Sequence, residues 1–234
     1  MAVRPVFSPT TSDPNLVAVH EVSFEWHPGL SLSQAQKSID ALHASARSRG
    51  IGRILEISTK SRDALGRGLS ALRLETRLPD GRLVAVESAF QGSKVFRDGG
   101  PFQDLYSSPG REAKTDARIR AAGPLTGFRL LNDQWPTEPK TVFFDWLYLK
   151  ALEENERMAG ALLDFEGFTD ITFNPGRSLN CQARSAVLFV SLWRRGLFRD
   201  AMTSREKYLA LVAPRGADPG AGGESGPQIP LFES

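Results

Sequence analysis

The sequence predicts an α+β fold: a mainly helical domain with a small antiparallel sheet, followed by a flexible C-terminal tail. Apolar residues recur at helical spacing in several segments, such as residues 31–49 and 135–152. Segments on both sides of a Pro-Asp-Gly turn alternate between apolar and polar residues, as the strands of a hairpin do. From residue 214 onward Gly, Pro, Ala and Ser dominate, and such a segment cannot bury enough apolar surface to fold. We therefore expect one domain over residues 1–213 and a flexible tail over residues 214–234.

The composition restricts the classes of protein to which the chain can belong. With 234 residues, of which 41% are hydrophobic, the chain can bury a sizeable core. No apolar run is long enough to cross a bilayer, and the N-terminus lacks the pattern of a signal peptide, so we expect a soluble, cytoplasmic protein without a membrane partner. The single cysteine, Cys181, excludes an internal disulfide. With only three histidines besides, we expect neither a metal centre nor a cofactor.

Basic residues gather in two parts of the chain, although the formal net charge is only +2. Such clusters could contact the phosphates of a nucleic acid, but a solvated surface balanced by acidic residues explains them equally well. The first cluster consists of Arg47, Arg49, Arg53, Lys60, Arg62, Arg67, Arg73 and Arg77, and the second of Arg111, Lys114, Arg118 and Arg120.

In the N-terminal part, local signals indicate a strand, a helix and a second strand. After a lead rich in Pro, Ser and Thr, residues 17–26 alternate as a half-buried strand does. Ser31 or Ser33 can cap a helix that runs to about residue 49, where Gly50 ends it. Residues 54–57 form a short apolar strand.

The predicted hairpin leads into a glycine-rich loop, residues 90–106. Its strands cover residues 72–78 and 83–90, and the second strand brings Glu87 and then Lys94 to one end of the sheet. Glycines allow close approach to a ligand, and aromatic rings can stack on a flat one. An ordinary connection between a hairpin and a helix is the alternative. The candidate site residues of this loop are Lys94, Gly99, Gly100, Phe102 and Asp104.

Helices dominate the second half of the chain. We expect a short basic helix over residues 111–122 and a strong helix that opens at Trp135, with Thr137 or Glu138 satisfying its first backbone donors. Three more helices follow, over residues 154–163, 178–196 and 204–211.

Residues 168–176 form an irregular aromatic loop before the apolar helix at residues 178–196. Its polar residues Asp170 and Asn174, together with Asn180 at the start of that helix, could bind sugar hydroxyls or phosphates, because backbone N–H groups and the helix dipole point there. Turn formation and helix capping explain the same residues equally well.

Several of these segments share their order and spacing with one protein family. They are the glycine loop at residues 99–105, Trp-Pro-Thr-Glu at residues 135–138, the aspartate loop at residues 169–173 and the asparagine-led helix start at residues 180–183. Together they resemble the NADAR superfamily, also called YbiA-like, and more closely its branch associated with DarT toxins. Residues 24–31 and 55–61 extend the resemblance over nearly the whole ordered chain.

The resemblance implies removal of ADP-ribose from guanine bases in DNA, as the antidote to a DarT-type toxin. In the chemistry proposed for the family, a lysine amine attacks C1″ of the distal ribose and holds the opened sugar as a Schiff base. Lys94 would be that nucleophile, and Glu138, or with less support Asp104, would transfer protons. The remaining site residues would hold the sugar and diphosphate or stack on a base: Gly99, Gly100, Phe102, Trp135, Asp170, Phe173, Asn174 and Asn180.

Other functions and one further partner remain open. The chain could bind ADP-ribosylated DNA or the toxin without catalysis, or it could cleave a small aminopyrimidine nucleotide, as other branches of the superfamily do. In the tail, residues 228–232 look like the pentapeptide by which bacterial replication and repair proteins dock on the sliding clamp, with Gln228, Leu231 and Phe232 as contacts.

Overall fold

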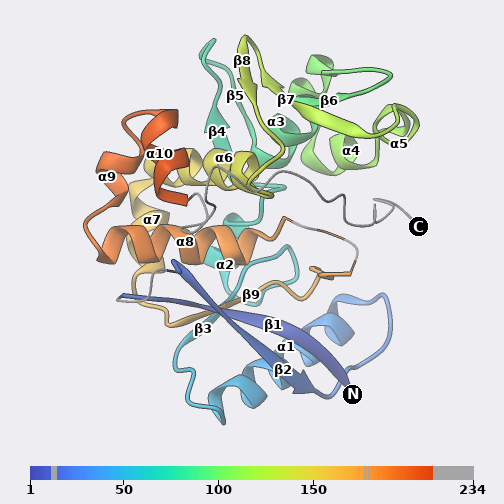
Figure 1. Cartoon of the computed structure of the whole chain (residues 1–234). Coiled ribbons are helices and arrows are strands. Elements are labelled where there is room, and N and C mark those ends of the chain that lie inside the picture. Colours follow the sequence, from blue (N-terminus) through green and yellow to red (C-terminus); the bar gives the residue numbers. More distant parts are fainter. Residues whose placement is uncertain (12–14, 177, 179, 213–234) are drawn as a thin grey trace, which may run out of the picture.

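The computed structural model (Figure 1) describes residues 1–11, 15–176, 178 and 180–212. The predicted tail, with the peptide that resembles a clamp-binding sequence, lies outside these residues. The α+β class is confirmed, but the expectation of one small antiparallel sheet is wrong, because the strands form three sheets. The largest has the order β2-β1-β9-β3. It contains β1 (Ala2–Pro9), β2 (Val17–Phe24), β3 (Ile54–Glu56) and β9 (Gly167–Thr169), and it is mixed because β3 and β9 run parallel.

Strand β1 was not predicted, because its prolines and serines indicate a loop when they are considered alone. The strand pairs with β2 along its whole length, from Ala2 opposite Phe24 to Pro9 opposite Val17. On its other side, Phe7 of β1 pairs with β9. These residues have only a weak local preference for a strand, and pairing on two sides makes up for it.

Helices cover both faces of this sheet (Figure 1). The predicted first helix is confirmed as α1 (Leu32–Arg47), with Ser31 accepting a hydrogen bond from the Gln34 N–H at 3.2 Å. It packs on one face through an apolar cluster. On the other face lies α8 (Gln182–Arg194), which in turn packs against α6 (Val142–Glu153). The cluster beneath α1 consists of Val6, Val22, Phe24, Ile39, Leu42, Ala46 and Ile171.

The predicted hairpin is confirmed only near its turn. β4 (Glu75–Arg77) and β5 (Leu83–Ala85) pair as expected, but the chain then forms the helix α3 (Val86–Gly92) instead of continuing as a strand to residue 90. Backbone N–H groups at the start of α3 donate to carbonyls of a preceding segment, and Phe90 packs on aromatic rings of α6. These long-range contacts favour the helix over the strand.

A three-stranded antiparallel sheet follows α3 and consists of β6 (Lys94–Phe96), β7 (Leu125–Leu130) and β8 (Asp133–Trp135). Trp135 therefore ends a strand, and α6 begins only at Val142, so the prediction that Thr137 or Glu138 caps this helix is wrong. The residue before α6 is Thr141, which has a left-handed backbone with φ of 73°.

The remaining helices are short. The predicted basic helix at residues 111–122 is divided at Asp116, whose side chain accepts a hydrogen bond from the Arg118 N–H at 2.8 Å and so caps the second helix. Within the described residues, no helix has the length and apolar character needed to cross a membrane. The short helices are α2 (Ala64–Gly68), the 3-10 helix η1 (Gln103–Ser107), α4 (Gly110–Thr115), α5 (Ala117–Ala121), α7 (Glu156–Leu162), α9 (Phe198–Ala201) and α10 (Arg205–Val212).

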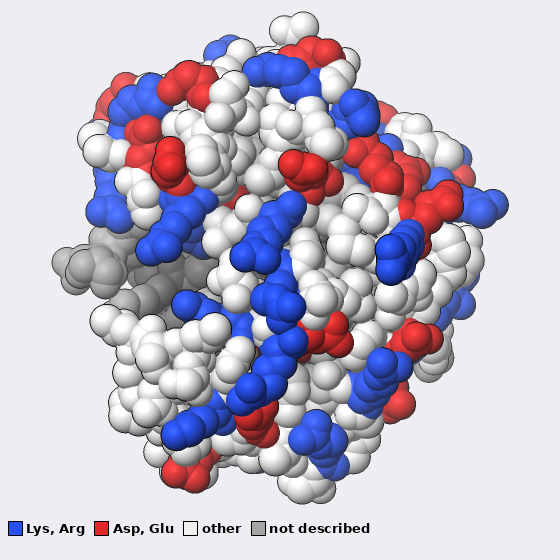
Figure 2. Space-filling view, turned by 180° about the vertical axis from the view of Figure 1, so that it is seen from behind, with Lys and Arg blue, Asp and Glu red and all other residues white. Residues whose placement is uncertain are grey.

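Acidic neighbours neutralise part of the two basic clusters. Arg62 pairs with Asp40 at 2.9 Å, and Arg118 pairs with both Asp104 and Asp116. On the face seen in Figure 2, Lys and Arg side chains nevertheless form a band down the middle of the molecule. The ion pairs agree with the explanation of a surface balanced by acidic residues, and contact with the phosphates of a nucleic acid stays a prediction.

Candidate functional site

Lys94 begins strand β6 directly after helix α3, and its backbone is held on both sides. The hydroxyl of Ser93 donates to the Ala89 carbonyl at 2.7 Å and shares a hydrogen bond of 3.0 Å with the Tyr106 hydroxyl. The Arg129 N–H of β7 donates to the Ser93 carbonyl at 2.7 Å. Lys94 is therefore positioned by regular structure rather than by a loop.

The side chain of Lys94 is buried, with 7% of the residue exposed, and its Nζ lies 4.7 Å from the centre of the Phe90 ring. Among the described residues, none accepts a hydrogen bond from this Nζ. Burial lowers the pKa of Lys94 from 10.5 to about 8, against the opposing effect of the Glu87 carboxylate, and the charge of Lys114 lowers it further. About one amine in ten is then unprotonated at pH 7, far more than for an ordinary lysine.

Glu87 supplies a buried carboxyl group next to Lys94, with 6% of the residue exposed. Its Oε1 accepts a hydrogen bond from Gln91 Nε2 at 2.8 Å and lies 3.9 Å from Lys114 Nζ. The other amide atom, Gln91 Oε1, is buried without a partner among the described residues. Glu87 lies on helix α3 rather than on a strand, and its charge acts on Lys94.

Lys94, Glu87, Gln91 and Lys114 form the first polar group of the site. A second polar group lies around the end of β9 and the start of α8. Asp170 is buried, and its Oδ1 accepts hydrogen bonds from the N–H and the hydroxyl of Thr172 at 2.9 and 2.6 Å. Gln182 links α8 to the segment before β4, because its Oε1 accepts from the Ala71 N–H and its Nε2 donates to the Ile57 carbonyl, both at 2.7 Å.

Glu56 is a second buried carboxyl group, close enough to Asp170 for their charges to repel. Glu56 accepts hydrogen bonds from the Thr169 hydroxyl at 2.6 Å and the Ile171 N–H at 2.9 Å. Burial, followed by the charge of Asp170, raises the pKa of Glu56 to about 7. Burial also raises the pKa of Asp170, and the positive charge of Lys114 opposes this rise. Lys114 therefore acts on carboxyl groups in both polar groups.

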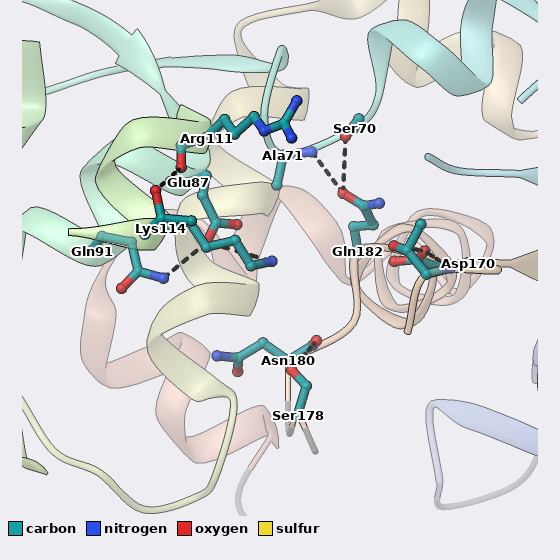
Figure 3. Close-up of polar contacts among 12 residues, drawn as sticks. Ser70, Ala71, Glu87, Gln91, Arg111, Lys114, Asp170, Ser178, Asn180 and Gln182 are labelled. Carbon is teal, nitrogen blue, oxygen red and sulfur yellow. Dashed lines mark hydrogen bonds and ion pairs between the residues drawn. The ribbon is translucent and has the colours of Figure 1, made fainter. Parts of the chain in front are cut away.

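Figure 3 shows Glu87, Gln91 and Lys114 together with Asp170 and Gln182 of the second polar group. Residues of α3 and α4 lie on one side of the view, Asp170 and Gln182 lie on the other, and Asn180 lies below, between them. The Lys114 side chain reaches past Glu87 toward the second group, and the Asn180 side chain extends toward the first. The tertiary structure thus brings segments more than eighty residues apart into one polar region, from Glu87 to Asp170.

The two carboxylates expected from the sequence to transfer protons are both exposed. Glu138 is exposed in the connection between β8 and α6 and accepts a hydrogen bond from the Lys140 N–H at 3.0 Å. Asp104 is also exposed, and its ion pair with Arg118 at 2.6 Å lowers its pKa. Both carboxylates are therefore accessible to water and engaged with groups other than the Lys94 amine.

The aromatic candidates differ in how much surface they offer. Trp135 is 5% exposed and packs against Phe143 and Trp146, with ring centres 5.4 and 5.3 Å away, so its ring belongs to the core. Phe102 and Phe173 are half-buried, which leaves part of each ring available for stacking.

Asn174 and Asn180 border the second polar group. The Asn174 side chain accepts a hydrogen bond from the Gly176 N–H at 3.0 Å and so stabilises a turn, as one of the two sequence-based explanations proposed. The backbone carbonyl of Asn180 accepts a hydrogen bond from the Ser178 hydroxyl at 3.2 Å, and the Asn180 side chain extends toward Glu87 and Lys114 in Figure 3.

Gly99 and Gly100 hold the loop after β6 against the backbone of Lys94. Gly99 accepts a hydrogen bond from the Phe96 N–H at 2.8 Å. Gly100 has a φ of +80°, and a Cβ there would lie 2.4 Å from the Lys94 carbonyl oxygen. A side chain at residue 100 is therefore unfavourable both for its own backbone and for the position of Lys94.

We expect Gly100→Ala to lower the free energy of unfolding by about 1–3 kcal/mol, because alanine at this φ is strained, and the close contact adds to that cost. Urea denaturation measures the change. Gly160→Ala in α7 is the matched control: nothing lies within 4 Å of an added Cβ there, and replacing a helical glycine should stabilise the protein by about 0.5–1 kcal/mol. Equal stability of the two variants would contradict the prediction.

Sequence reasoning did not select Gln91, Glu56 or Gln182, and it placed Lys114 only in a basic cluster. A helical reading of residues 86–92 would have shown Gln91 one turn after Glu87. For Glu56 and Gln182 no local signal exists, because their roles depend on partners more than a hundred residues away. Among the described residues no group of His, Cys, Asp and Glu side chains could hold a metal ion.

Comparison with known proteins identifies a family for this chain. A family model described as "DarT1-associated NADAR antitoxin" matches residues 2–219 and so includes every element that carries a residue of the two polar groups. A search of curated proteins found no match.

Proposed function

Because the chain belongs to the DarT1-associated NADAR antitoxin family, we propose that it is a glycohydrolase that removes ADP-ribose from guanine bases in DNA. The resemblance inferred from the sequence is thereby confirmed, and the family pairs the protein with a DarT-type toxin as its antitoxin. The observation that best supports the proposed activity is the Lys94 amine, which is buried, has a lowered pKa and has a carboxyl group beside it. A lysine in such a position is suited to attack an electrophilic carbon.

In the proposed reaction, the ribose ring opens when the C1″–O4″ bond breaks, the ring oxygen takes a proton and the guanine nitrogen forms a double bond to C1″. The unprotonated Lys94 amine adds to C1″, and a proton moves from the new ammonium to the guanine nitrogen. The C1″–guanine bond then breaks, the base leaves with its electron pair, and an imine to Lys94 remains. Water adds to the imine and releases the lysine, so that ADP-ribose departs and its sugar closes again.

We assign the proton transfers to Glu87 rather than to Glu138 or Asp104. Glu87 is buried next to the amine, whereas the other two carboxylates are exposed and engaged elsewhere. A proton-transfer group must lie within hydrogen-bond reach of the reacting atoms, directly or through one water molecule. Glu87 acts electrostatically on the amine, so a water molecule between the two groups could carry the proton.

We propose that the second polar group holds the sugar and diphosphate. Asp170, Asn174 and Asn180 would bind hydroxyl and phosphate groups, the backbone of Gly99 and Gly100 would border the sugar, and Phe102 or Phe173 would stack on a base. The basic band in Figure 2 is consistent with a DNA substrate, because its charges can contact phosphates next to the modified base.

A single assay separates this proposal from the other functions. The purified protein is incubated with an oligonucleotide that carries ADP-ribose on guanine, and the products are followed by gel electrophoresis and mass spectrometry. The proposal predicts release of ADP-ribose and recovery of the unmodified oligonucleotide. A binder without catalytic activity would retard the oligonucleotide without forming product, and an aminopyrimidine nucleotide glycosidase would cleave the small nucleotide but not the modified DNA.

The lowered pKa of Lys94 predicts a characteristic pH dependence. The protonated form cannot attack the sugar, so below the pKa of about 8 the rate should increase with pH by roughly tenfold per unit. It should become constant once most of the amine is unprotonated. Single-turnover rates between pH 6 and pH 9 measure this profile. A rate that does not change between pH 6 and pH 8 would contradict a reacting amine with this pKa.

A further inference from the structure

Helix α4 approaches α3 closely enough to place Lys114 over Glu87. A Cβ added to Gly110, at the start of α4, would lie 3.2 Å from the Glu87 Cβ and 3.2 Å from the Leu72 Cα, so a larger residue would displace the helix. One turn later, Lys114 Nζ lies 3.9 Å from Glu87 Oε1. The close packing of the two helices therefore brings Lys114 to the Glu87 carboxyl group, which also acts on Lys94.

The charged groups that act on the Lys94 amine come from the two helices packed beside it. Glu87 of α3 attracts a proton to the amine, and Lys114 of α4 repels one. The third neighbour is the Phe90 ring, whose face also attracts the ammonium form. Lys114 is thus the neighbouring charge that favours the unprotonated amine.

We propose that Lys114 is a positioning residue that keeps Lys94 reactive: its ammonium pairs with Glu87 and repels the proton that Lys94 would otherwise bind. This inference rests on the proposed role of Lys94 as nucleophile. Removal of Lys114 has two consequences of the same sign, because the repulsion disappears and the charge of Glu87 is no longer balanced. Both consequences favour the ammonium form of Lys94, which cannot attack a carbon.

The effect should be moderate and sensitive to salt. The Lys114 side chain is 61% exposed, so water and ions screen its charge. We therefore expect loss of this charge to lower the rate at pH 7 roughly two- to fivefold rather than to abolish it. High salt should produce a similar loss in the unchanged protein and little further loss in a variant that lacks the charge.

The test measures the protonation of Lys94 directly, by NMR titration of the lysine Cε–Hε signals in the full chain, with the Lys94 signal identified from Lys94→Arg. Lys114→Met should move the titration midpoint of Lys94 upward, and Lys114→Arg, which keeps the charge, should leave the midpoint near its original value. Arg157→Met in α7 removes an exposed charge elsewhere and is the matched control. The pH profile of cleavage should shift in the same direction as the titration.

An unchanged midpoint in Lys114→Met would overturn the proposal, as would equal shifts in Lys114→Met and Lys114→Arg. A higher KM for modified DNA without a shifted midpoint would also overturn it, and would instead make Lys114 a contact for an anionic group of the substrate. The titration needs no substrate. It can therefore support the action of Lys114 on Lys94 even where the cleavage assay fails, so the two proposals can be rejected separately.

Discussion

Replacement of Lys94 with methionine is expected to abolish release of ADP-ribose from modified guanine, by roughly a thousandfold or more. The folded protein should be at least as stable as before. Methionine has a similar length, and its apolar side chain can occupy the buried space against Phe90 without the cost of burying an amine. Loss of activity with an unchanged or higher melting temperature would therefore identify a chemical role rather than a structural one. Cleavage at the original rate would disprove the imine mechanism.

A trapping experiment examines the same lysine by another route. Borohydride reduces an imine to a stable amine, so protein mixed with substrate and borohydride should gain the mass of the bound sugar nucleotide. Peptide mapping should place the added mass on Lys94, and Lys94→Arg should show none. Added mass on Lys114 instead would reverse the roles that we assign to the two lysines.

Glu87→Gln is expected to lower the cleavage rate by about 10²–10⁴-fold, the usual contribution of a group that transfers protons. Glutamine has nearly the same shape, and its amide oxygen can still accept the hydrogen bond from Gln91 Nε2. The fold should therefore be preserved, which circular dichroism and thermal denaturation can check. Glu156→Gln, an exposed residue of α7, is the control for the loss of one negative charge.

The sign of the change distinguishes two possible roles of Glu87. The carboxylate raises the pKa of Lys94, so its removal should by itself lower that pKa and increase the amount of unprotonated amine at pH 7. If Glu87 acted only through its charge, the variant would be faster at pH 7. A large loss therefore indicates proton transfer. A larger loss in Glu138→Gln or Asp104→Asn would return this role to one of the carboxylates first selected from the sequence.

The sequence selected Glu87 and Lys94 as neighbours, although it assigned them to the wrong element. Residues 83–90 alternate between apolar and polar types, but Val86, Ala89 and Phe90 also fit one face of a helix. The tertiary contacts decide between the two. The Val86 N–H donates to the Leu74 carbonyl at 2.9 Å, and Phe90 packs on Phe144 of α6 with ring centres 5.3 Å apart.

The choice among the carboxylates could not be made from the sequence. Glu87, Glu138 and Asp104 are all acidic residues near a predicted loop or helix end, and no local pattern indicates which is buried. Burial depends on what covers a residue, and for Glu87 this includes α4, which lies more than twenty residues further along the chain. The lowered pKa of Lys94 depends on the same covering, because burial of the amine is the main reason for the lowering.

The sequence by itself determined the family, the α+β class, the identity of Lys94 as the leading candidate, and helices with their own signals, such as α1 with its Ser31 cap and α8 with Gly196 after its end. Each of these follows from residues close together in the chain, where periodicity and capping act. Only the tertiary structure decided the pairing of β1 with β2 and of β6 with β7, the start of α3, and the grouping of Glu87, Lys114 and Asp170 in one region. Strand pairing, burial and electrostatic coupling act between segments far apart in the chain, and a local pattern of residues carries no information about which segments will meet.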